Sequence, residues 1–481
     1  MSKKLLLSLV AVLAVFAGCR KFDDINTDPA RPAETEPRYL LASAEKRAVD
    51  LMYHGYYNGR IGMHYAQYWT GTDKTGESRN LLSDDGLWAA LYAGPLMDLQ
   101  EITNYYNRHP EQRNKQEEAV AGILKAWIFH VLTDVYTDIP YSQALQADTY
   151  PQPVFDHAED VYRDLLSSLK GHINTLNAAG GSPVTGDILG NGNKEYWVRF
   201  ANALRMRIAM RMADVKPAEA RIVIEEAARY TLQSVKDDVY FPYNSNSVSN
   251  RFPYNDADRP MVEFAVTTTL INYLKQTNDP RLPVYARVAT ATQKYQGKPY
   301  GQADNSPVLD SLSRPGVLMY SAGNKGYIIT YAEVMFLKAE AAARGMYVGG
   351  DAGSLYEEAI RASMQQWNIS DNNFTVTAYL DNVPYNAGKW KNVIGTQKWI
   401  ALYMQGLQAW MERLRLDFKR PDGKPLFIPP FSGSLDPEVA DVPQRLNYPN
   451  ATRNSNAANV EAAARHIGKD SKATKNWWDI Q

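Results

Sequence analysis

The sequence predicts a mainly α-helical protein, built from tetratricopeptide-like helix hairpins and joined to an irregular, loop-rich half. Two observations predict the helical part. Apolar residues recur at spacings of three and four along much of the 481-residue chain, and several such segments follow one another across short polar loops. The loop-rich half is predicted by a change in composition between about 236 and 327, where Pro, Asn, Ser and Tyr become frequent and the helical periodicity of apolar residues is lost.

The helical elements begin soon after residue 38. Leu40, Leu41, Ala44, Ala48 and Leu51 recur at spacings of three and four, which places one apolar stripe on a first helix. The clearest later helical segments are 117–136, 158–176, 194–215, 216–232, 327–345 and 354–369.

The last two of these segments indicate how the helices pair. Gly345 is well placed to end a helix, because glycine adopts the left-handed conformation without a Cβ clash, and the next helix restarts near Ser354. Small residues on the first helix allow a second helix to approach closely; they are Ala332, Ala339, Ala342 and Ala343. Because no strict repeat length is visible, we predict degenerate helix-hairpin repeats.

We expect one domain over 38–481, with loop-rich insertions at about 236–327 and 370–395. The first insertion contains the tetrapeptide Phe-Pro-Tyr-Asn twice, which places Tyr243 and Tyr254 on short extended arms, since Pro forces the preceding residue into an extended conformation. Tyr295 and Tyr300 follow on glycine-containing loops. Loops held on a rigid scaffold are common binding surfaces, so these tyrosines are candidate ligand contacts, and packing of the loops themselves is the alternative.

The N-terminus has the pattern of a secretory signal. Two lysines precede an apolar run from Leu5 to Phe16, and small residues lead to Cys19, the only cysteine in the chain. The run is shorter than the ~20 residues that a membrane-spanning helix needs. We predict a lipoprotein signal peptide over 1–18, lipid attachment (a palmitate-bearing anchor) at Cys19, and a polar tether over 19–37.

Composition excludes several functions. With 52 basic and 53 acidic residues and no basic stripe, the chain is not expected to bind nucleic acid. A single, lipidated thiol leaves no disulfide and no cysteine nucleophile. The seven histidines show no ligand spacing along the sequence, and nucleotide or hydrolase motifs are missing, so no cofactor is predicted, whereas metal binding is not readable from the sequence.

Six blocks, in order along the chain, carry a resemblance to a known family. They are "INTDP" (25–29), "ILKAWIFHVLTDVYTDIPYSQAL" (123–145), "WVRFANALRMRIAMR" (197–211), "ITYAEVMFLKAEAAARG" (329–345), "GTQKWIALYMQGLQAW" (395–410) and "NWWDIQ" (476–481). These blocks resemble the SusD/RagB family of nutrient-binding outer-membrane lipoproteins, over nearly the whole chain. The resemblance implies a framework of tetratricopeptide-like helix pairs against which a loop-rich, ligand-binding half packs.

The resemblance also implies a function in nutrient uptake. Such proteins are anchored by lipid in the outer membrane, face the exterior of Bacteroidota cells, and form a lid over a SusC-like TonB-dependent barrel. We therefore expect carbohydrate binding, with a glycan or oligosaccharide as the ligand and peptide as the alternative, and delivery of the ligand to the barrel for TonB-dependent transport.

The resemblance places part of the site in the loop after the first helix, over 64–88. Tyr68 and Trp69 would form a platform for a sugar ring, and Arg79 and Asn80 would be the polar partners. Packing of Trp69 in the helical core is the equally weighted alternative.

We predict that the protein is not an enzyme, because no residue combination identifies a catalyst. The alternative is a surface-anchored, all-helical glycoside hydrolase, since the separation of a carboxylate pair is a property of the fold and not of the sequence.

Overall fold

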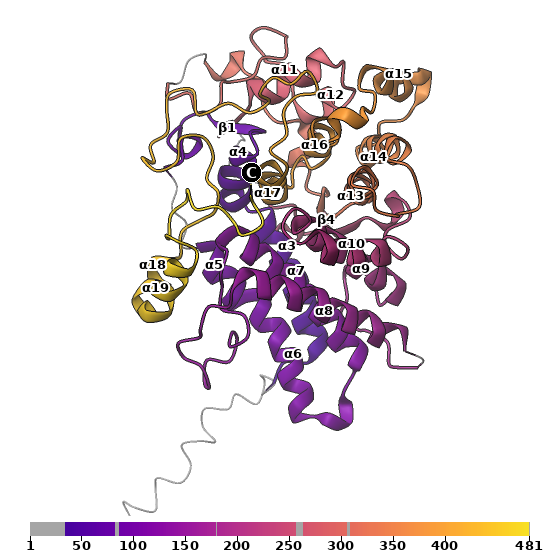
Figure 1. Cartoon of the computed structure of the whole chain (residues 1–481), viewed down its shortest axis with the longest axis vertical. Helices are drawn as coiled ribbons and strands as arrows, with labels where there is room; N and C mark the ends of the chain where they lie inside the picture. Colours follow the sequence, from indigo (N-terminus) through magenta and orange to yellow (C-terminus); the bar gives the residue numbers. More distant parts are fainter. Residues whose placement is uncertain (1–33, 82–85, 179, 256–262, 305–307, 481) are drawn as a thin grey trace, which may run out of the picture.

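The computed structural model describes residues 34–81, 86–178, 180–255, 263–304 and 308–480. The signal peptide 1–18, Cys19 and the tether up to residue 33 lie outside the described residues, so the predicted lipid anchor stays a prediction. Figure 1 shows a body made largely of helices, with the helices of the N-terminal half at one end and a loop-rich region at the other.

The first described helix, α3 (Pro37–Met52), starts at a proline, whose fixed φ suits the first helical turn. Its stripe of Leu41, Ala44 and Ala48 is fully buried, as the sequence predicts. The next helical elements before residue 110 are a π-helical stretch Gly55–Gly62, α4 (Met63–Tyr65), α5 (Gly86–Leu91), a π-helical turn Tyr92–Leu96 and α6 (Met97–Arg108).

Helices α7 to α10 form the layered, tetratricopeptide-like part. They are α7 (Lys115–Tyr136), α8 (Ala158–Asn177), α9 (Lys194–Arg211) and α10 (Pro217–Ala227). Each packs on the next, so that neighbours in sequence are neighbours in space. Helix α7 starts where the Asn114 side chain accepts hydrogen bonds from the N–H groups of Gln116 and Glu117.

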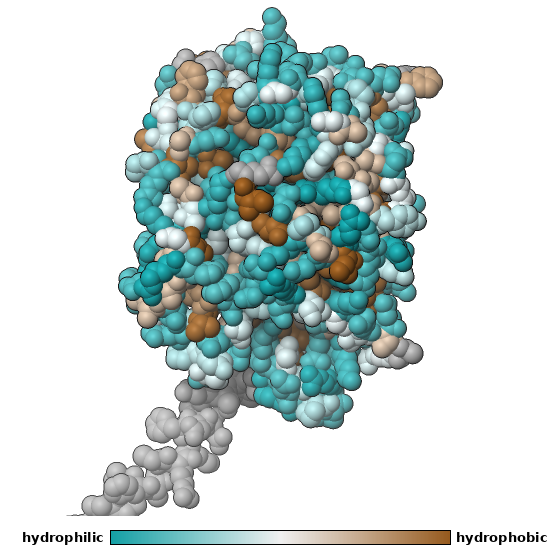
Figure 2. Space-filling model, in the orientation of Figure 1, coloured by the Kyte–Doolittle hydropathy of each residue, from teal (hydrophilic) through white to brown (hydrophobic). Residues whose placement is uncertain are grey.

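Helix α7 is long and apolar enough to cross a membrane by length and composition, but 83% of its most apolar window is buried inside the protein. It is therefore the central helix of a globular core. Figure 2 shows a largely hydrophilic face on which hydrophobic side chains form only small, separated patches.

Two short antiparallel strand pairs tie the loop-rich half together. Strand β1 (Trp69–Gly71) pairs with β3 (Phe264–Val266), and β2 (Val239–Pro242) pairs with β4 (Lys325–Ile329). Along the chain, two helices follow β3 and precede β4: α11 (Thr268–Gln276) and α12 (Leu282–Tyr285). The prediction of helix from residue 327 was wrong for its first turn, because Tyr327 to Ile329 complete β4 and the helix begins only after Thr330, whose hydroxyl caps it.

The C-terminal half returns to helices. They are α13 (Tyr331–Ala343), α14 (Ala352–Gln366), α15 (Thr375–Asn382), α16 (Trp390–Ala401), α17 (Gly406–Leu416), α18 (Asn450–Ser455) and α19 (Ala457–His466). Helices α13 and α14 form the predicted hairpin, and Gly345 follows α13 with φ +77°, as expected of a left-handed helix end. Short 3-10 turns lie at Glu77–Arg79, Pro110–Gln112, Val235–Asp237, Val248–Asn250, Leu309–Ser311, Val317–Tyr320, Asn372–Phe374 and Ala387–Lys389.

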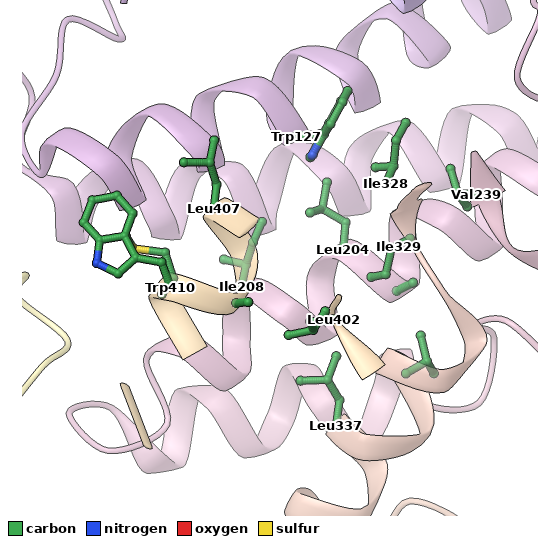
Figure 3. Packing of buried hydrophobic residues seen from close by; sticks show 14 of the residues in the cluster. Trp127, Leu204, Ile208, Val239, Ile328, Ile329, Leu337, Leu402, Leu407 and Trp410 are labelled. Atoms are coloured by element: carbon green, nitrogen blue, oxygen red, sulfur yellow. The ribbon is translucent and has the colours of Figure 1, made fainter. Parts of the chain in front are cut away.

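One hydrophobic core joins the two halves. Figure 3 shows Trp127 of α7, Leu204 of α9, Ile328 of β4, Leu337 of α13 and Trp410 of α17 converging on it. Residues more than 280 positions apart along the chain therefore share one packed interior, which contains side chains of both the helical and the loop-rich halves.

A buried ion network crosses the same region. Arg207 of α9 binds Glu333 of α13 through two hydrogen bonds of 2.8 and 2.7 Å. One turn further, Arg211 binds Asp134 and Glu412 at 3.0 and 2.7 Å. The remaining members are Arg415, Glu340 and Lys398, which pair with Glu412 or with each other. Every charge in the network has an opposite partner, which buried charges require.

Candidate ligand-binding surface

The two aromatic residues predicted as a platform lie in the core. Tyr68 and Trp69 are both 0% exposed. Tyr68 stacks on Trp399 with ring centroids 5.1 Å apart, and the Trp69 indole N–H donates to the Tyr403 hydroxyl at 2.8 Å. The structure thus places Trp69 in the packed position that the sequence left open as the alternative, and neither ring presents a face to solvent.

The two Phe-Pro-Tyr-Asn arms fold inward over this aromatic group. Tyr254 packs edge-on against Trp69 at 5.5 Å, and Tyr243 donates from its hydroxyl to Asp50 at 2.7 Å. Both tyrosines are at most 5% exposed, and burial raises the pKa of Tyr254 well above its usual value. Of the other two candidates, Tyr300 is fully buried and Tyr295 is half-buried against the core. These four side chains hold their loops in place.

Arg79 and Asn80 bind a second loop instead of standing free. The Arg79 guanidinium donates to the carbonyls of Gly433 and Ser432, both at 2.9 Å. Asn80 adopts the left-handed conformation (φ 66°), and its amide donates to the Ser434 hydroxyl at 3.0 Å and to the Asp441 carbonyl at 3.1 Å. Both residues therefore fix the path of the chain around 432–441.

A third segment completes this arrangement. The Phe431 N–H donates to the Tyr300 carbonyl at 2.7 Å, and the Ser432 N–H donates to the Gly301 carbonyl at 3.2 Å. The Thr75 hydroxyl donates to the Ala303 carbonyl at 3.0 Å. We name the three segments 72–81, 299–304 and 428–441 the loop platform. The predicted residues Arg79, Asn80 and Tyr300 meet here, although they were predicted as ligand contacts and not as supports.

Gly301 explains how closely the segments approach. Its φ is +66°, and a Cβ atom at this position would lie 2.6 Å from Pro430 Cβ and 2.9 Å from the Ser78 carbonyl oxygen. Only glycine satisfies both the left-handed conformation and the contact. The platform is therefore assembled from close backbone contacts.

Apolar side chains project from the platform into solvent. Phe431 is 67% exposed, Leu81 is 60% exposed and Leu435 is 42% exposed. Leu81 and Leu435 lie on the same side of Gly76, within 3.0 and 3.5 Å of where its Cβ would stand. Phe431 was missed by the sequence reasoning, although "PPFSG" at 429–433 is a strong turn signal that could have marked an exposed aromatic ring.

A cleft of about 400 Å³ adjoins the platform, lined in part by Phe427, Asp441, Glu438 and Lys475. Two of its carboxylates, Asp441 and Glu438, are paired with cations. Asp441 accepts two hydrogen bonds of 3.0 Å from Arg413, and Glu438 accepts from Lys469 and Ser471, which hold the pKa of Glu438 below its usual value. A general acid for glycoside hydrolysis needs the opposite shift, a raised pKa, so the environment of Glu438 is not that of such an acid.

The site described so far is a hydrogen-bonded loop platform on a helical framework, with an exposed aromatic ring at Phe431 and a polar cleft along its 438–441 segment. The chain belongs to the SusD-like family, whose description is "Starch-binding associating with outer membrane" and whose model matches residues 29–449. It is thus a SusD-like protein associated with the outer membrane, from a family of binding proteins that are generally non-catalytic.

Solved structures give the same result. A chitin-binding protein is 26% identical, with a TM-score of 0.81 over 93% of this chain and 100% of its own. A chitin-binding SusD homologue from Flavobacterium johnsoniae is 23% identical, with a TM-score of 0.80 over 92% of this chain and 99% of its own. A SusD homologue from Bacteroides uniformis is 23% identical, with a TM-score of 0.76 over 92% and 100%. The predicted family and the tetratricopeptide-like, mainly helical fold are confirmed. A comparison with curated protein sequences gives no match.

Proposed function

We propose that this protein is a cell-surface lipoprotein that captures glycan or oligosaccharide and delivers it to a SusC-like TonB-dependent barrel in the outer membrane. The observation that carries the proposal is the SusD-like match over residues 29–449, together with a structural similarity that covers 93% of the chain. The chitin-binding function of a 26% identical relative supports a glycan in preference to a peptide.

The loop platform is the surface that we assign to the glycan. Sugar rings stack on aromatic faces, and Phe431 presents a ring that is 67% exposed. The turn that carries it is fixed on both sides, by the Tyr300 and Gly301 carbonyls and by Arg79. A turn whose main chain is already fixed loses little conformational freedom on binding, which favours affinity. Arg79 and Asn80 support the segment that carries the ring, and the neighbouring cleft supplies carboxylate and amide groups for sugar hydroxyls.

A pair of matched substitutions tests this assignment. Phe431→Ala is expected to weaken binding of chitin oligosaccharides or starch fragments about tenfold, since loss of a stacking aromatic costs roughly 0.5–1.5 kcal/mol beyond its buried area. Phe374→Ala is the control, because Phe374 is also highly exposed (76%) but precedes α15, outside the platform. Calorimetry on a panel of oligosaccharides measures both. Equal losses of affinity for the two variants, or no loss for Phe431→Ala, would refute the assignment of the loop platform to the glycan.

The transport partner is tested separately. Outer membranes of the native organism are solubilised in mild detergent, and proteins that co-purify with this chain are identified by mass spectrometry. A TonB-dependent barrel in near-equal amount is the expected result. If the intact, lipidated protein brings down no barrel, the delivery step is wrong, whatever the glycan measurements show.

The lipid anchor has its own test, because Cys19 lies outside the described residues. Labelled palmitate is expected to enter the wild-type protein and not the Cys19→Ala variant. Continued labelling of the variant would place the lipid elsewhere.

A further inference from the structure

Three side chains that are far apart in sequence meet at the edge of the helical layer. Asp138 follows α7, His157 precedes α8, and His466 is the last residue of α19. One potential ligand atom from each lies within 4.8 Å of the others, and no other such group of His, Cys, Asp and Glu is found in the described part of the chain. Figure 1 shows α18 and α19 at the margin of the molecule, against its helical end.

We propose that Asp138, His157 and His466 form a binding site for a divalent transition-metal ion, with Zn²⁺ as the expected occupant. Two imidazoles and one carboxylate are a common ligand set for zinc, in which the remaining position is held by water or an exogenous ligand. This site is independent of the loop platform and of the proposed transport function.

The carboxylate is already fixed in place. Asp138 is 2% exposed, and one of its oxygens accepts the Ala158 N–H at 2.9 Å, at the first turn of α8. Its other oxygen faces His466 Nδ1 at 2.6 Å. A buried carboxylate is stabilised when a cation lies beside it, because its charge then has an opposite partner.

The two imidazoles are close and accessible. Their rings stack in parallel, with centroids 3.6 Å apart and an interplanar angle of 3°, and the side chains are 53% and 48% exposed. The neutral form of an imidazole carries a lone pair on one ring nitrogen, and this is the atom that binds a metal. The His157 side chain makes no helix-capping hydrogen bond, because Asp138 takes that role.

The surrounding charges favour a cation. His466 lies at the C-terminal end of α19, where the helix dipole stabilises positive charge. Asp160 lies 3.9 Å from His157 Nδ1, and its other oxygen lies 3.9 Å from Arg163 Nη1, so its charge is shared between the two. The dipole of α8 has the opposite sign at His157, and the Asp138 carboxylate on that helix end offsets it.

Binding would fasten the C-terminal helix pair to the body. Helix α19 packs mainly on α18, and the pair is held to the body by the buried side chains of Val460 and Ala463 and by hydrogen bonds such as that from the Asn456 amide to the Pro153 carbonyl at 2.7 Å. Because a ligand that binds only the folded state stabilises that state, metal binding is expected to raise the melting temperature.

The test uses tag-free protein that has been cleared of metal with a chelator. Titration calorimetry with ZnCl₂ is expected to show one site, and the affinity is expected to fall by about tenfold or more in His157→Ala and in His466→Ala. His109→Ala is the matched control, since His109 is also a surface imidazole beside a carboxylate, that of Glu34, but has no second histidine. Melting curves without metal establish that the variants fold.

A spectroscopic measurement keeps the ligand assignment falsifiable. Electron paramagnetic resonance of the Cu²⁺-loaded protein is expected to show two nitrogen donors in the wild type and one in each single-histidine variant. Unchanged zinc affinity in both variants, a loss equal to that of His109→Ala, or an unaltered copper spectrum would each overturn the proposal. In that case the cluster is only a hydrogen-bonded contact between α8 and α19.

Discussion

Glu412 offers a quantitative test of the buried ion network. Its carboxylate lies 2.7 Å from Arg211 Nη1, 2.8 Å from Arg415 Nη2 and 2.9 Å from Lys398 Nζ. These cations hold the pKa of Glu412 well below its usual value although burial acts in the opposite direction. Glu412→Gln keeps the size and shape of the side chain and removes only its charge, so the effect is electrostatic.

The expected magnitude follows from the charge balance. The fully buried part of the network has four cations and four carboxylates: Arg207, Arg211, Arg415 and Lys398, with Asp134, Glu333, Glu340 and Glu412. At its margin Arg344 and Asp214 add one charge of each sign. Glu412→Gln leaves one buried positive charge without compensation. Removal of one partner of a buried ion pair costs about 3–5 kcal/mol of unfolding free energy, and the three cations around Glu412 place the expected loss at the upper end, about 5 kcal/mol.

Urea unfolding followed by circular dichroism measures this loss. Glu219→Gln is the control, because Glu219 pairs with Arg163 on the surface and such exposed pairs contribute only about 0–1 kcal/mol. A loss of unfolding free energy below about 1 kcal/mol for Glu412→Gln would refute the view that the buried cations depend on Glu412 for compensation of their charge.

Three further predictions concern pH and backbone geometry. Burial raises the pKa of Asp238 from 3.8 to about 7. The folded protein therefore keeps a proton that the unfolded chain releases, and its stability falls as pH rises through this window. Asp238→Asn should raise the melting temperature at about pH 8 and leave it nearly unchanged at about pH 4. Burial lowers the pKa of His130 from 6.5 to about 4, so stability is lost as pH falls through that range, and His130→Asn should flatten the decline in a pH series of melting curves. Gly301→Ala should reduce both stability and glycan binding more than Gly423→Ala, which has a similarly positive φ but nothing within 4 Å of its Cβ position; equal losses would show that strain alone, and not the close contact, decides the effect.

Local sequence patterns predicted most of the framework. The period of the apolar residues located α7 and α8 within two residues at each end and α14 within three, because an amphipathic helix carries its own signal. The same pattern failed at Tyr327 to Ile329, since residues that belong to a helix stripe also suit a strand, and the partner strand β2 lies about 85 residues earlier. Pairing over such distances leaves no local trace.

The candidate surface was predicted only in part, for a related reason. Arg79 and Asn80 lie in the loop platform, but their hydrogen bonds to residues 432–441 depend on a contact across about 350 residues. Aromatic composition could not separate the buried Trp69 from the exposed Phe431, because exposure is a property of the assembled fold. The histidines of the proposed metal site lie 309 positions apart, which is why no ligand spacing is visible in the sequence.

The loop platform has a consequence for how this protein can change. Several of the bonds that shape it end on main-chain carbonyls, at Tyr300, Gly301, Ser432 and Gly433, and such acceptors are supplied by any residue type. The outward side chains of Phe431, Leu81 and Leu435 take no part in those bonds, so each can be exchanged while the architecture beneath it persists. Related proteins could therefore change ligand specificity by substitutions at these three surface positions, while the backbone of the loop platform stays the same.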